Sequence, residues 1–333
     1  MQSAEADFVL FQPRVSNPRD LTGGREMRIF VTGATGVTGR RAVPLLVAAG
    51  HEVTAVARSP EKAAALATAG ASPIVVDLFD AAAMRRAVAG HEAVLNLATA
   101  VPPSSRALLR GAWKEMDRIR RDASAILVDA ALAAGAGRFV QESFAPIYAD
   151  DGDGWIGEGA PVKPSRYNRT TLDAERSAAR FGAGGGTGVV LRFGWFYGPD
   201  AGGATLDMIG FVRKGWSPAP GPEGYISSIS HDDTATAVVA ALGIPAGIYN
   251  VVDDEPVRRR EFFGSLARAL GVAPPKFLPK WVGSLLGGAG ETLSRSLRIS
   301  NRKFRDASGW APKYPSVRDA WPDLLREAGI AVR

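Results

Sequence analysis

The sequence contains no cysteine and only three histidines, His51, His91 and His231, which lie far apart along the chain. Disulfide bonds and thiolate chemistry are therefore excluded, and a histidine-rich metal site is not expected, because such sites need clustered ligands. No apolar run approaches the roughly 20 residues that a membrane-spanning helix requires. These absences predict a protein with no metal and no membrane partner, and they are consistent with a cytoplasmic location.

The length and the net charge of the chain restrict the fold and the possible partners less strongly. A chain of 333 residues can bury a core as one large domain or as a domain with a smaller lobe. The net charge is +6, and residues 255–333 alone carry 15 Lys and Arg against 7 Asp and Glu, a balance of +8. Because no aromatic residues alternate with these charges, as a base-stacking surface would need, we interpret them as a solvated face and expect no nucleic-acid partner.

Residues 1–26 differ from the rest of the chain, because they are polar and irregular and include Pro13 and Pro18. They lack the basic start and the apolar centre of a signal peptide. We expect this segment to be a disordered tail, or the product of a start codon placed upstream of Met27.

The most informative segment is a glycine-rich stretch, residues 32–39, that reads Thr-Gly-Ala-Thr-Gly-Val-Thr-Gly. It follows an apolar run at 27–31 and precedes a helical pattern at 40–46. A strand, a glycine-rich turn and a helix in this order are typical of a dinucleotide-binding site.

Each glycine of this stretch is expected to meet a different structural requirement. Gly33 permits the tight turn, Gly36 lets the backbone approach a pyrophosphate, and Gly39 lets the helix lie close to the strand. The N-terminus of the helix offers free N–H groups to the phosphates. The predicted cofactor contacts in the turn are Gly33, Thr35, Gly36, Val37 and Gly39.

Strand-like and helix-like segments alternate from Met27 to about Phe193. This alternation predicts an α/β fold, a Rossmann-type doubly wound parallel sheet with helices on both faces. The expected later strands are 53–57, 74–76, 93–97, 138–141 and 189–192, and the expected helices are 61–69, 81–88, about 105–134 and 167–181. Glycine and proline break the pattern after Gly194. We therefore predict a dinucleotide-binding domain over 27–193 and mainly a smaller, mixed substrate lobe over 194–330, with segments near 228–252 returning to the main domain.

The end of the second strand favours NADP over NAD. Sites that prefer NAD usually carry an acid there, whereas this chain has Arg58 and Ser59. A guanidinium can pair with the 2′-phosphate that an acid would repel, and Lys62 and Arg40 could add charge.

Two further strand ends supply weaker cofactor predictions. Asp77 and Leu78 follow the third strand, where the adenine amino group would lie, although an Asp after a strand is also a common helix cap. Asn96, Leu97 and Ala98 follow the fourth strand and would line the cofactor cleft.

Taken together, these segments resemble the extended short-chain dehydrogenase/reductases of the NAD-dependent epimerase/dehydratase type. The resemblance runs from Met27 to about Trp321. It rests on the glycine turn, RFVQES at 138–143, Tyr167, LRFG at 191–194 with YGP at 197–199, ISHDD at 229–233, IYNV at 248–251, SNRK at 300–303 and GWAP at 309–312. It implies a Rossmann fold, a nicotinamide cofactor, and a Tyr-x-x-x-Lys helix working with a Ser or Thr after the fifth strand.

The catalytic positions depart from that family pattern. Tyr167 matches the family's tyrosine, but Thr171 stands in the place of the lysine. Phe144 occupies the usual Ser/Thr place, Ser143 is one position early, and Arg120 replaces an asparagine of the long helix. Without the lysine, the phenol should keep a pKa near its ordinary value of about 10, which suits a proton donor better than a base.

The candidate catalytic residues are therefore Tyr167, Ser143 and Glu142. Glu142 ends a buried strand that faces the cofactor, where a carboxyl group can act as acid or base. An equally good interpretation is a strand-end residue whose carboxylate is capped by backbone groups. Five aromatic residues are expected to favour an apolar pocket: Trp155, Trp195, Phe196, Tyr197 and Trp216. The apolar stretch at 281–300 is either a flap over that pocket or a plain surface helix.

The sequence predicts an NADPH-dependent reductase that acts on a carbonyl or an activated double bond of a fairly apolar small molecule. Two alternatives stay open. One is a non-redox enzyme, such as an isomerase or cyclase with Glu142 as its base, and the other is a catalytically silent NADP-binding sensor. The oligomeric state is also open, with a homodimer as one option.

Overall fold

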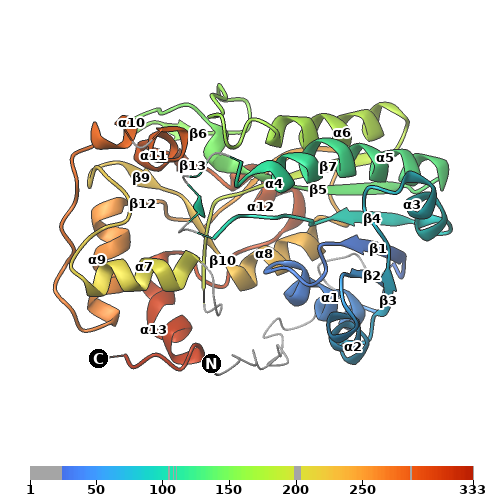
Figure 1. The fold of residues 1–333 in the computed structure, drawn as a ribbon, viewed down its shortest axis with the longest axis horizontal. Coiled ribbons are helices and arrows are strands. Elements are labelled where there is room, and N and C mark those ends of the chain that lie inside the picture. Colours follow the sequence, from blue (N-terminus) through green and yellow to red (C-terminus); the bar gives the residue numbers. More distant parts are fainter. Residues whose placement is uncertain are drawn as a thin grey trace.

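The computed structural model describes residues 25–103, 106–107, 109, 111–198, 204–285 and 287–332. Nearly all of the predicted N-terminal tail, residues 1–24, lies outside the described residues. Figure 1 shows a broad sheet with its helices on the right and a smaller group of helices and short strands on the left.

A seven-stranded parallel sheet forms the centre of the larger part, in the order β11-β7-β5-β4-β1-β2-β3. Its strands are β1 (Arg28–Thr32), β2 (Glu52–Ala57), β3 (Ser72–Val75), β4 (Ala93–Asn96), β5 (Arg138–Phe144), β7 (Thr187–Phe193) and β11 (Gly247–Val251). The order reverses between β1 and β4, because the chain builds outward to β3 and then returns to the other side of β1. Open α/β sheets bind ligands outside the carboxyl ends of the strands at such a point.

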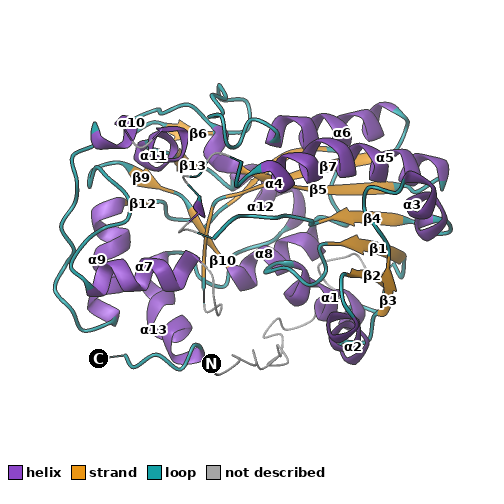
Figure 2. Ribbon diagram, in the orientation of Figure 1, coloured by secondary structure: helices purple, strands orange, loops and turns teal. Residues whose placement is uncertain are grey.

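Helices cover both faces of this sheet, as the alternating pattern predicts (Figure 2). On one face lie α1 (Gly39–Ala48), α2 (Pro60–Thr68), α8 (His231–Ala240) and α12 (Arg302–Ser308); on the other lie α3 (Ala81–Val88), α5 (Ser124–Ala133) and α6 (Thr171–Ala183). Successive strand residues alternate between these faces, so that Val31 packs toward α1 and Phe30 packs toward α5.

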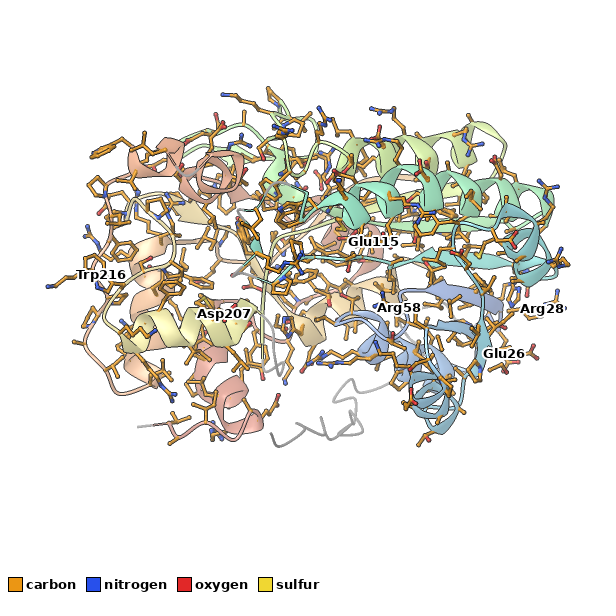
Figure 3. The ribbon with its side chains drawn as sticks, viewed as in Figure 1. Glu26, Arg28, Arg58, Glu115, Asp207 and Trp216 are labelled. Carbon is orange, nitrogen blue, oxygen red and sulfur yellow. The ribbon has the colours of Figure 1, made fainter. Side chains whose placement is uncertain are left out.

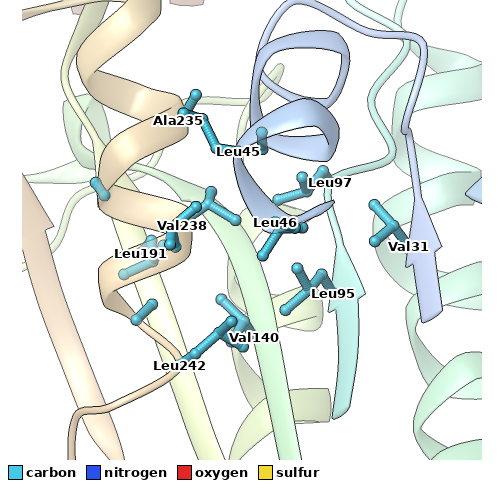
Figure 4. Packing of buried hydrophobic residues seen from close by; sticks show 14 of the residues in the cluster. Val31, Leu45, Leu46, Leu95, Leu97, Val140, Leu191, Ala235, Val238 and Leu242 are labelled. Carbon is cyan, nitrogen blue, oxygen red and sulfur yellow. The ribbon is translucent and has the colours of Figure 1, made fainter. Parts of the chain in front are cut away.

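The core on the α1 and α8 face is made of aliphatic side chains. Figure 4 shows residues of α1 and of the α8 segment meeting side chains of the sheet: Leu45, Leu46, Ala235, Val238 and Leu242 with Val31, Leu95, Leu97, Val140 and Leu191. Because the strands are buried on both faces, they read as continuous apolar runs, which is why the sequence locates them well.

The smaller lobe packs its helices around aromatic residues, among them Tyr197, Phe262 and Trp321. Its helices are α7 (Ala204–Arg213), α9 (Arg259–Ala269), α10 (Val282–Leu285), α11 (Gly287–Ser294) and α13 (Val317–Glu327). Short strands pair as β8 (Trp195–Tyr197) with β10 (Ser228–Ser230), β9 (Tyr225–Ile226) with β12 (Val257–Arg258), and β6 (Trp155–Ile156) with β13 (Arg298–Ile299).

The predicted return of residues 228–252 to the main domain is only partly as expected. β11 joins the main sheet beside β7, and α8 packs against α1. The stretch 228–230 instead pairs with β8, outside the main sheet. The domain boundary near residue 193 stays a prediction.

The long helix expected over about 105–134 is shorter and interrupted. Its regular part begins with α4 (Lys114–Arg118), and a π-helical segment, η3 (Ile119–Ala123), separates α4 from α5. Gly111 has a φ of 86°, a left-handed conformation that ends helical geometry before Lys114. Ser105 lies outside the described residues.

The expectation that Tyr167 opens a helix is wrong, because α6 begins at Thr171. The residues before it form turns in which the Asn168 N–H donates to the carbonyl of Ser165 at 3.2 Å and the Asn168 amide side chain reaches the carbonyl of Pro146 at 3.4 Å. Thr171 therefore does not share a helical face with Tyr167, and the Tyr-x-x-x-Lys geometry is absent as well as its lysine.

A buried polar network joins four elements of the main domain. Arg192 on β7 forms two hydrogen bonds with Glu175 on α6, at 2.8 and 2.7 Å. The Ser143 hydroxyl on β5 donates to the same carboxylate at 2.6 Å. Arg192 also donates to the Tyr148 hydroxyl at 2.7 Å, and that hydroxyl donates to Asn250 on β11 at 2.8 Å. The network holds the carboxyl ends of β5, β7 and β11 in register.

We predict that Glu175→Gln lowers the free energy of unfolding by about 3–5 kcal/mol, because it leaves the buried Arg192 cation without its partner. Urea denaturation of the two proteins measures this loss. The matched control is Asp129→Asn, which breaks the exposed pair of Asp129 with Arg180 and should cost less than about 1 kcal/mol. Equal, small losses in both variants would contradict the predicted role of the network.

Candidate functional site

The glycine turn after β1 is packed against the end of β4. Gly33 has a φ of 69°, and a Cβ atom there would lie 2.2 Å from the carbonyl oxygen of Leu97. A Cβ atom on Gly39 would lie 2.2 Å from the carbonyl oxygen of Gly33. Both positions therefore require glycine for close approach, as the sequence pattern predicts.

The same turn fits a dinucleotide pyrophosphate. In the described chain, no residue accepts a hydrogen bond from the backbone N–H groups of Thr35 and Val37, which precede the first residue of α1. A Cβ atom on exposed Gly36 would meet only the carbonyl of Gly33, at 3.2 Å, so the outer side of the turn is open. Unpaired N–H groups at a helix N-terminus are the donors that phosphate oxygens use.

Arg58 directly follows β2 and is exposed, with no hydrogen bond or ion pair to any described residue (Figure 3). Its guanidinium is therefore available for an anion. Ser59 is used differently, because its hydroxyl accepts a hydrogen bond from the N–H of Lys62 and caps α2. Of the two residues, Arg58 has the side chain that is free to reach a 2′-phosphate.

The residues after β3 form a turn. Asp77 is exposed and one of its carboxylate oxygens accepts from the N–H of Phe79 at 3.0 Å, while Asp80 is the residue that caps α3. Leu78 is half-buried and packs against the core on the α5 face. A contact of Asp77 or Leu78 with the adenine stays a prediction.

Asn96 is 2% exposed, and its side chain is fully used inside the protein. Its carbonyl oxygen accepts from the Thr32 hydroxyl at 2.7 Å, and its amide donates to Ser124 at 3.0 Å and to Gln141 at 2.9 Å. The amide thus joins β1, β4, β5 and the start of α5. Leu97 and Ala98 are buried beside the glycine turn. Any contact of residues 96–98 with the cofactor would therefore be made by their backbone atoms.

Ser143 is completely buried, and its hydroxyl donates to Glu175 as part of the network that includes Arg192. Its side chain points to the α6 face of β5, whereas Glu142 points to the opposite face. The structure therefore gives Ser143 a structural hydrogen bond, and its catalytic role stays a prediction.

Tyr167 is half-buried, and its ring packs against that of Trp113, with ring centroids 4.7 Å apart and the ring planes tilted by 53°. Burial of the hydroxyl raises the pKa of Tyr167 to about 12, although the nearby Thr292 hydroxyl and the charges of Arg120 and Arg295 act to lower it. The phenol therefore stays protonated at neutral pH. Thr292 belongs to α11, so the segment expected as a flap or surface helix reaches the candidate catalytic tyrosine.

Glu142 is 9% exposed, and its carboxylate makes no hydrogen bond or ion pair with any residue in the described ranges. Burial raises the pKa of Glu142, the positive charge of Arg120 lowers it, and the charge of Glu175 raises it further. The net direction is upward, so the carboxyl group is biased toward its neutral, proton-donating form.

Arg120 lies beside the candidate catalytic residues, where the family resemblance predicts an asparagine. It lies within η3, is 5% exposed, and is close enough to Glu142 and Tyr167 to affect the pKa of both. A π-helical segment has no sequence signal comparable to a glycine turn, so the sequence does not predict the burial of Arg120.

Of the five aromatic residues expected around the substrate, Trp195 lies near the end of β5 that carries Glu142 and Ser143. Its ring centroid is 5.2 Å from that of Phe144. Tyr197 is fully buried in the core of the smaller lobe, and Phe196 packs on Phe193. Trp155 and Trp216 are 53% and 46% exposed. Trp155 lines an open cavity of about 880 Å³ to which none of the candidate catalytic residues contributes.

The described residues contain no group of three or more His, Asp or Glu side chains placed to hold a metal ion. None of the helices in the described ranges has the length and apolar character that a membrane span needs.

Comparison with known proteins identifies the family. A family model described as NAD(P)H-binding matches residues 33–245. A 3-diazoavenalumate denitrifying reductase of a Streptomyces species is 36% identical over 310 residues, which cover 88% of this chain and 98% of the relative. A 4-hydroxy-2-methyl-3-oxo-4-farnesyl-3,4-dihydroquinoline-1-oxide ketoreductase of Stigmatella aurantiaca is 29% identical over 81% of this chain and 82% of its own length.

Solved structures agree on the fold. The human epimerase family protein SDR39U1, crystallised with NADPH, matches with a TM-score of 0.73 and 22% identity over 90% of this chain and 99% of its own. The dTDP-glucose 4,6-dehydratase DesIV of Streptomyces venezuelae, with NAD bound, also has a TM-score of 0.73, at 21% identity over 90% of this chain and 96% of its own.

The matches to the family model and to the reductase relatives, together with the glycine turn and the parallel sheet, support an NAD(P)-dependent oxidoreductase. The chain belongs to the NAD(P)H-binding family and is an extended short-chain dehydrogenase/reductase of the epimerase/dehydratase type.

Proposed function

We propose that this protein is an NADPH-dependent reductase that delivers hydride to a carbonyl or an activated double bond of a fairly apolar small molecule. The observation that carries the proposal is a pair of buried groups that can donate a proton: the Tyr167 phenol, with a pKa of about 12, and the Glu142 carboxyl, whose pKa is raised by burial. Bound NADPH would supply the hydride. The two reductase-named relatives support the same reaction class.

The site suits reduction better than alcohol oxidation. Oxidation needs a base to remove the hydroxyl proton, and a phenol with a pKa of about 12 holds its own proton at neutral pH. Reduction of a carbonyl instead needs a proton for the developing alkoxide, which Tyr167 or Glu142 can donate. The aromatic rings of Trp113, Phe144 and Trp195 add apolar surface around these donors.

A second candidate acceptor is a diazo group on an aromatic ring. The Streptomyces relative is named for the reductive loss of nitrogen from such a substrate, and this chain lacks the lysine and the Ser/Thr of the family's proton-transfer set. With an aryl diazonium, the C–N bond breaks, its electron pair leaves with N₂, and the hydride pair forms the new C–H bond. The ring carbon is reduced, NADPH is oxidised, and no proton donor is required.

NADPH is proposed as the working cofactor because Arg58 is free and occupies the place of the acid in NAD-preferring sites. We predict that Arg58→Ala weakens NADP binding by about tenfold or more and leaves NAD binding unchanged, since only NADP carries the 2′-phosphate. Titration against tryptophan fluorescence measures both affinities. Arg86→Ala, which removes an exposed arginine of α3, is the control, and equal NADP affinity in both variants would contradict the prediction.

The proton donor is tested by two conservative substitutions. With a carbonyl acceptor, loss of the donor through Tyr167→Phe or Glu142→Gln should lower kcat by about 10²- to 10⁴-fold, the usual effect of a general acid, with NADP affinity retained. Tyr249→Phe is the control, because that hydroxyl donates to the carbonyl of Pro245, outside the candidate site. The measurement is NADPH oxidation with a panel of aromatic aldehydes, ketones and enones.

The outcomes separate the candidate functions. Full turnover of both variants on a diazonium acceptor favours the second reaction, because that reaction needs no acid. Turnover of substrate without NADPH oxidation, abolished by Glu142→Gln, would replace the proposal with a non-redox enzyme. Absence of turnover in every assay, with NADP binding intact, would replace it with a sensor.

The pH dependence distinguishes the two donors. A general acid must be protonated, so a rate that depends on Glu142 should fall as the pH rises through the raised pKa of its carboxyl group. A rate that depends on Tyr167 should stay level to about pH 10, because the pKa of that phenol is about 12. Measuring kcat for carbonyl reduction between pH 5 and pH 10, with the Glu142→Gln variant as reference, decides between them.

A further inference from the structure

Arg120 is a buried cation whose hydrogen-bonding groups are not satisfied inside the protein. The residue is 5% exposed, and its Nε and Nη1 atoms have no hydrogen-bond partner among the described residues. Nearly all buried polar groups in native proteins are paired, and a buried charge without a partner is strongly destabilising. An unpaired guanidinium in this position therefore calls for a partner that is not part of the described chain.

The local backbone is built to place this side chain. Arg120 lies in the π-helical segment η3, an arrangement that is rare and is often found at functional sites. The segment is braced at its end by Ser124, whose hydroxyl donates to the carbonyl of Ile119 at 3.3 Å and accepts from Asn96 at 3.0 Å. Asn96 ends β4, at the reversal of strand order, so Arg120 is held near the carboxyl edge of the sheet where ligands bind.

The titratable groups near Arg120 do not pair with it. They are Asp117 of α4, Glu142 of β5, Glu175 of α6, and Tyr167, which precedes α6; none forms a hydrogen bond or ion pair with Arg120 within the described chain. Asp117 accepts from the Thr170 hydroxyl at 2.7 Å, and Glu175 is engaged by Arg192 and Ser143.

Aromatic side chains lie close to the residues that surround Arg120. Tyr167 packs against Trp113, and Phe144, which shares a face of β5 with Glu142, meets Trp195 edge to face. A guanidinium binds planar carboxylates through parallel N–H donors, and aromatic side chains favour an aromatic body.

We propose that Arg120 binds the carboxylate of the substrate, so that the enzyme acts on aromatic carboxylic acids. This inference rests on the proposed function for the reaction and adds to it the class of substrate. Arg120 is then a specificity-determining residue: the carboxylate binds one edge of the guanidinium and supplies a partner for Nε or Nη1, and the ring of the substrate lies against the aromatic residues near Tyr167.

The test compares cinnamate with cinnamamide, which share a ring and a side chain and differ in the charge. Binding of each to the full-length protein loaded with NADP is measured by calorimetry, so no turnover is needed. The wild-type protein should bind cinnamate about 10- to 100-fold more tightly, the effect of one charge-assisted pair. Arg120→Gln should abolish this preference, whereas Arg121→Gln, at the exposed neighbour in the same segment, should retain it.

A different role for Arg120, that of holding Glu142 in place, is tested by two further variants. Glu142→Gln should keep the preference for cinnamate. The double variant Arg120→Gln with Glu142→Gln should lack it. Because the double variant has no buried carboxylate at residue 142, it guards against misfolding of the Arg120→Gln single variant. Restored preference in the double variant would overturn the proposal. Loss of NADP affinity in Arg120→Gln would also overturn it, by assigning the residue to the cofactor.

Equal binding of cinnamate and cinnamamide to the wild-type protein, or binding of neither, overturns the proposal directly. These results are distinguishable from failure of the proposed function. Preference for cinnamate without NADPH oxidation on any substrate would reject the reductase and leave the carboxylate site standing. NADPH oxidation with no preference for acids would reject the carboxylate site alone.

Discussion

The Asn96 amide is the interaction on which the arrangement at the carboxyl edge of the sheet depends. It binds Thr32 of β1, Gln141 of β5 and Ser124 of α5, and so joins the strands on both sides of the strand-order reversal. The glycine turn begins directly after Thr32, and η3 ends directly before Ser124. One buried side chain therefore sets the relation between the cofactor turn and Arg120.

The second constraint is the treatment of buried charge. Glu175 and Arg192 are paired through two hydrogen bonds, which allows two ionised groups to be buried together. Glu142 and Arg120 are buried close to each other without such a pair, and burial raises the pKa of Glu142 although the charge of Arg120 acts to lower it. The first pair satisfies its own charges, whereas Glu142 and Arg120 have no such partner among the described residues. This contrast is the physical basis for placing function at residues 120 and 142.

The protein has the glycine turn of its family, with glycines at 33, 36 and 39. Thr171 and Phe144 stand where the family resemblance leads us to expect a lysine and a Ser or Thr. The shift of Tyr167 from a helix to a turn removes the geometry in which a lysine could have acted on it. This difference is the reason for proposing hydride transfer to electrophiles that need a simple proton donor or none.

The sequence by itself determined the parallel sheet, the glycine turn and the exposed Arg58, because these depend on local patterns: apolar runs, a glycine spacing and the residue that follows a strand. Only the tertiary structure decided the rest. Ser143 meets Glu175 across 32 residues, and Tyr167 lies before α6, next to Asn168, whose amide donates to the carbonyl of Pro146 across 22 residues. Arg120 is unpaired because neighbouring carboxylates have other partners or lie beyond its reach. Such contacts join residues far apart in the chain, so no local pattern carries them.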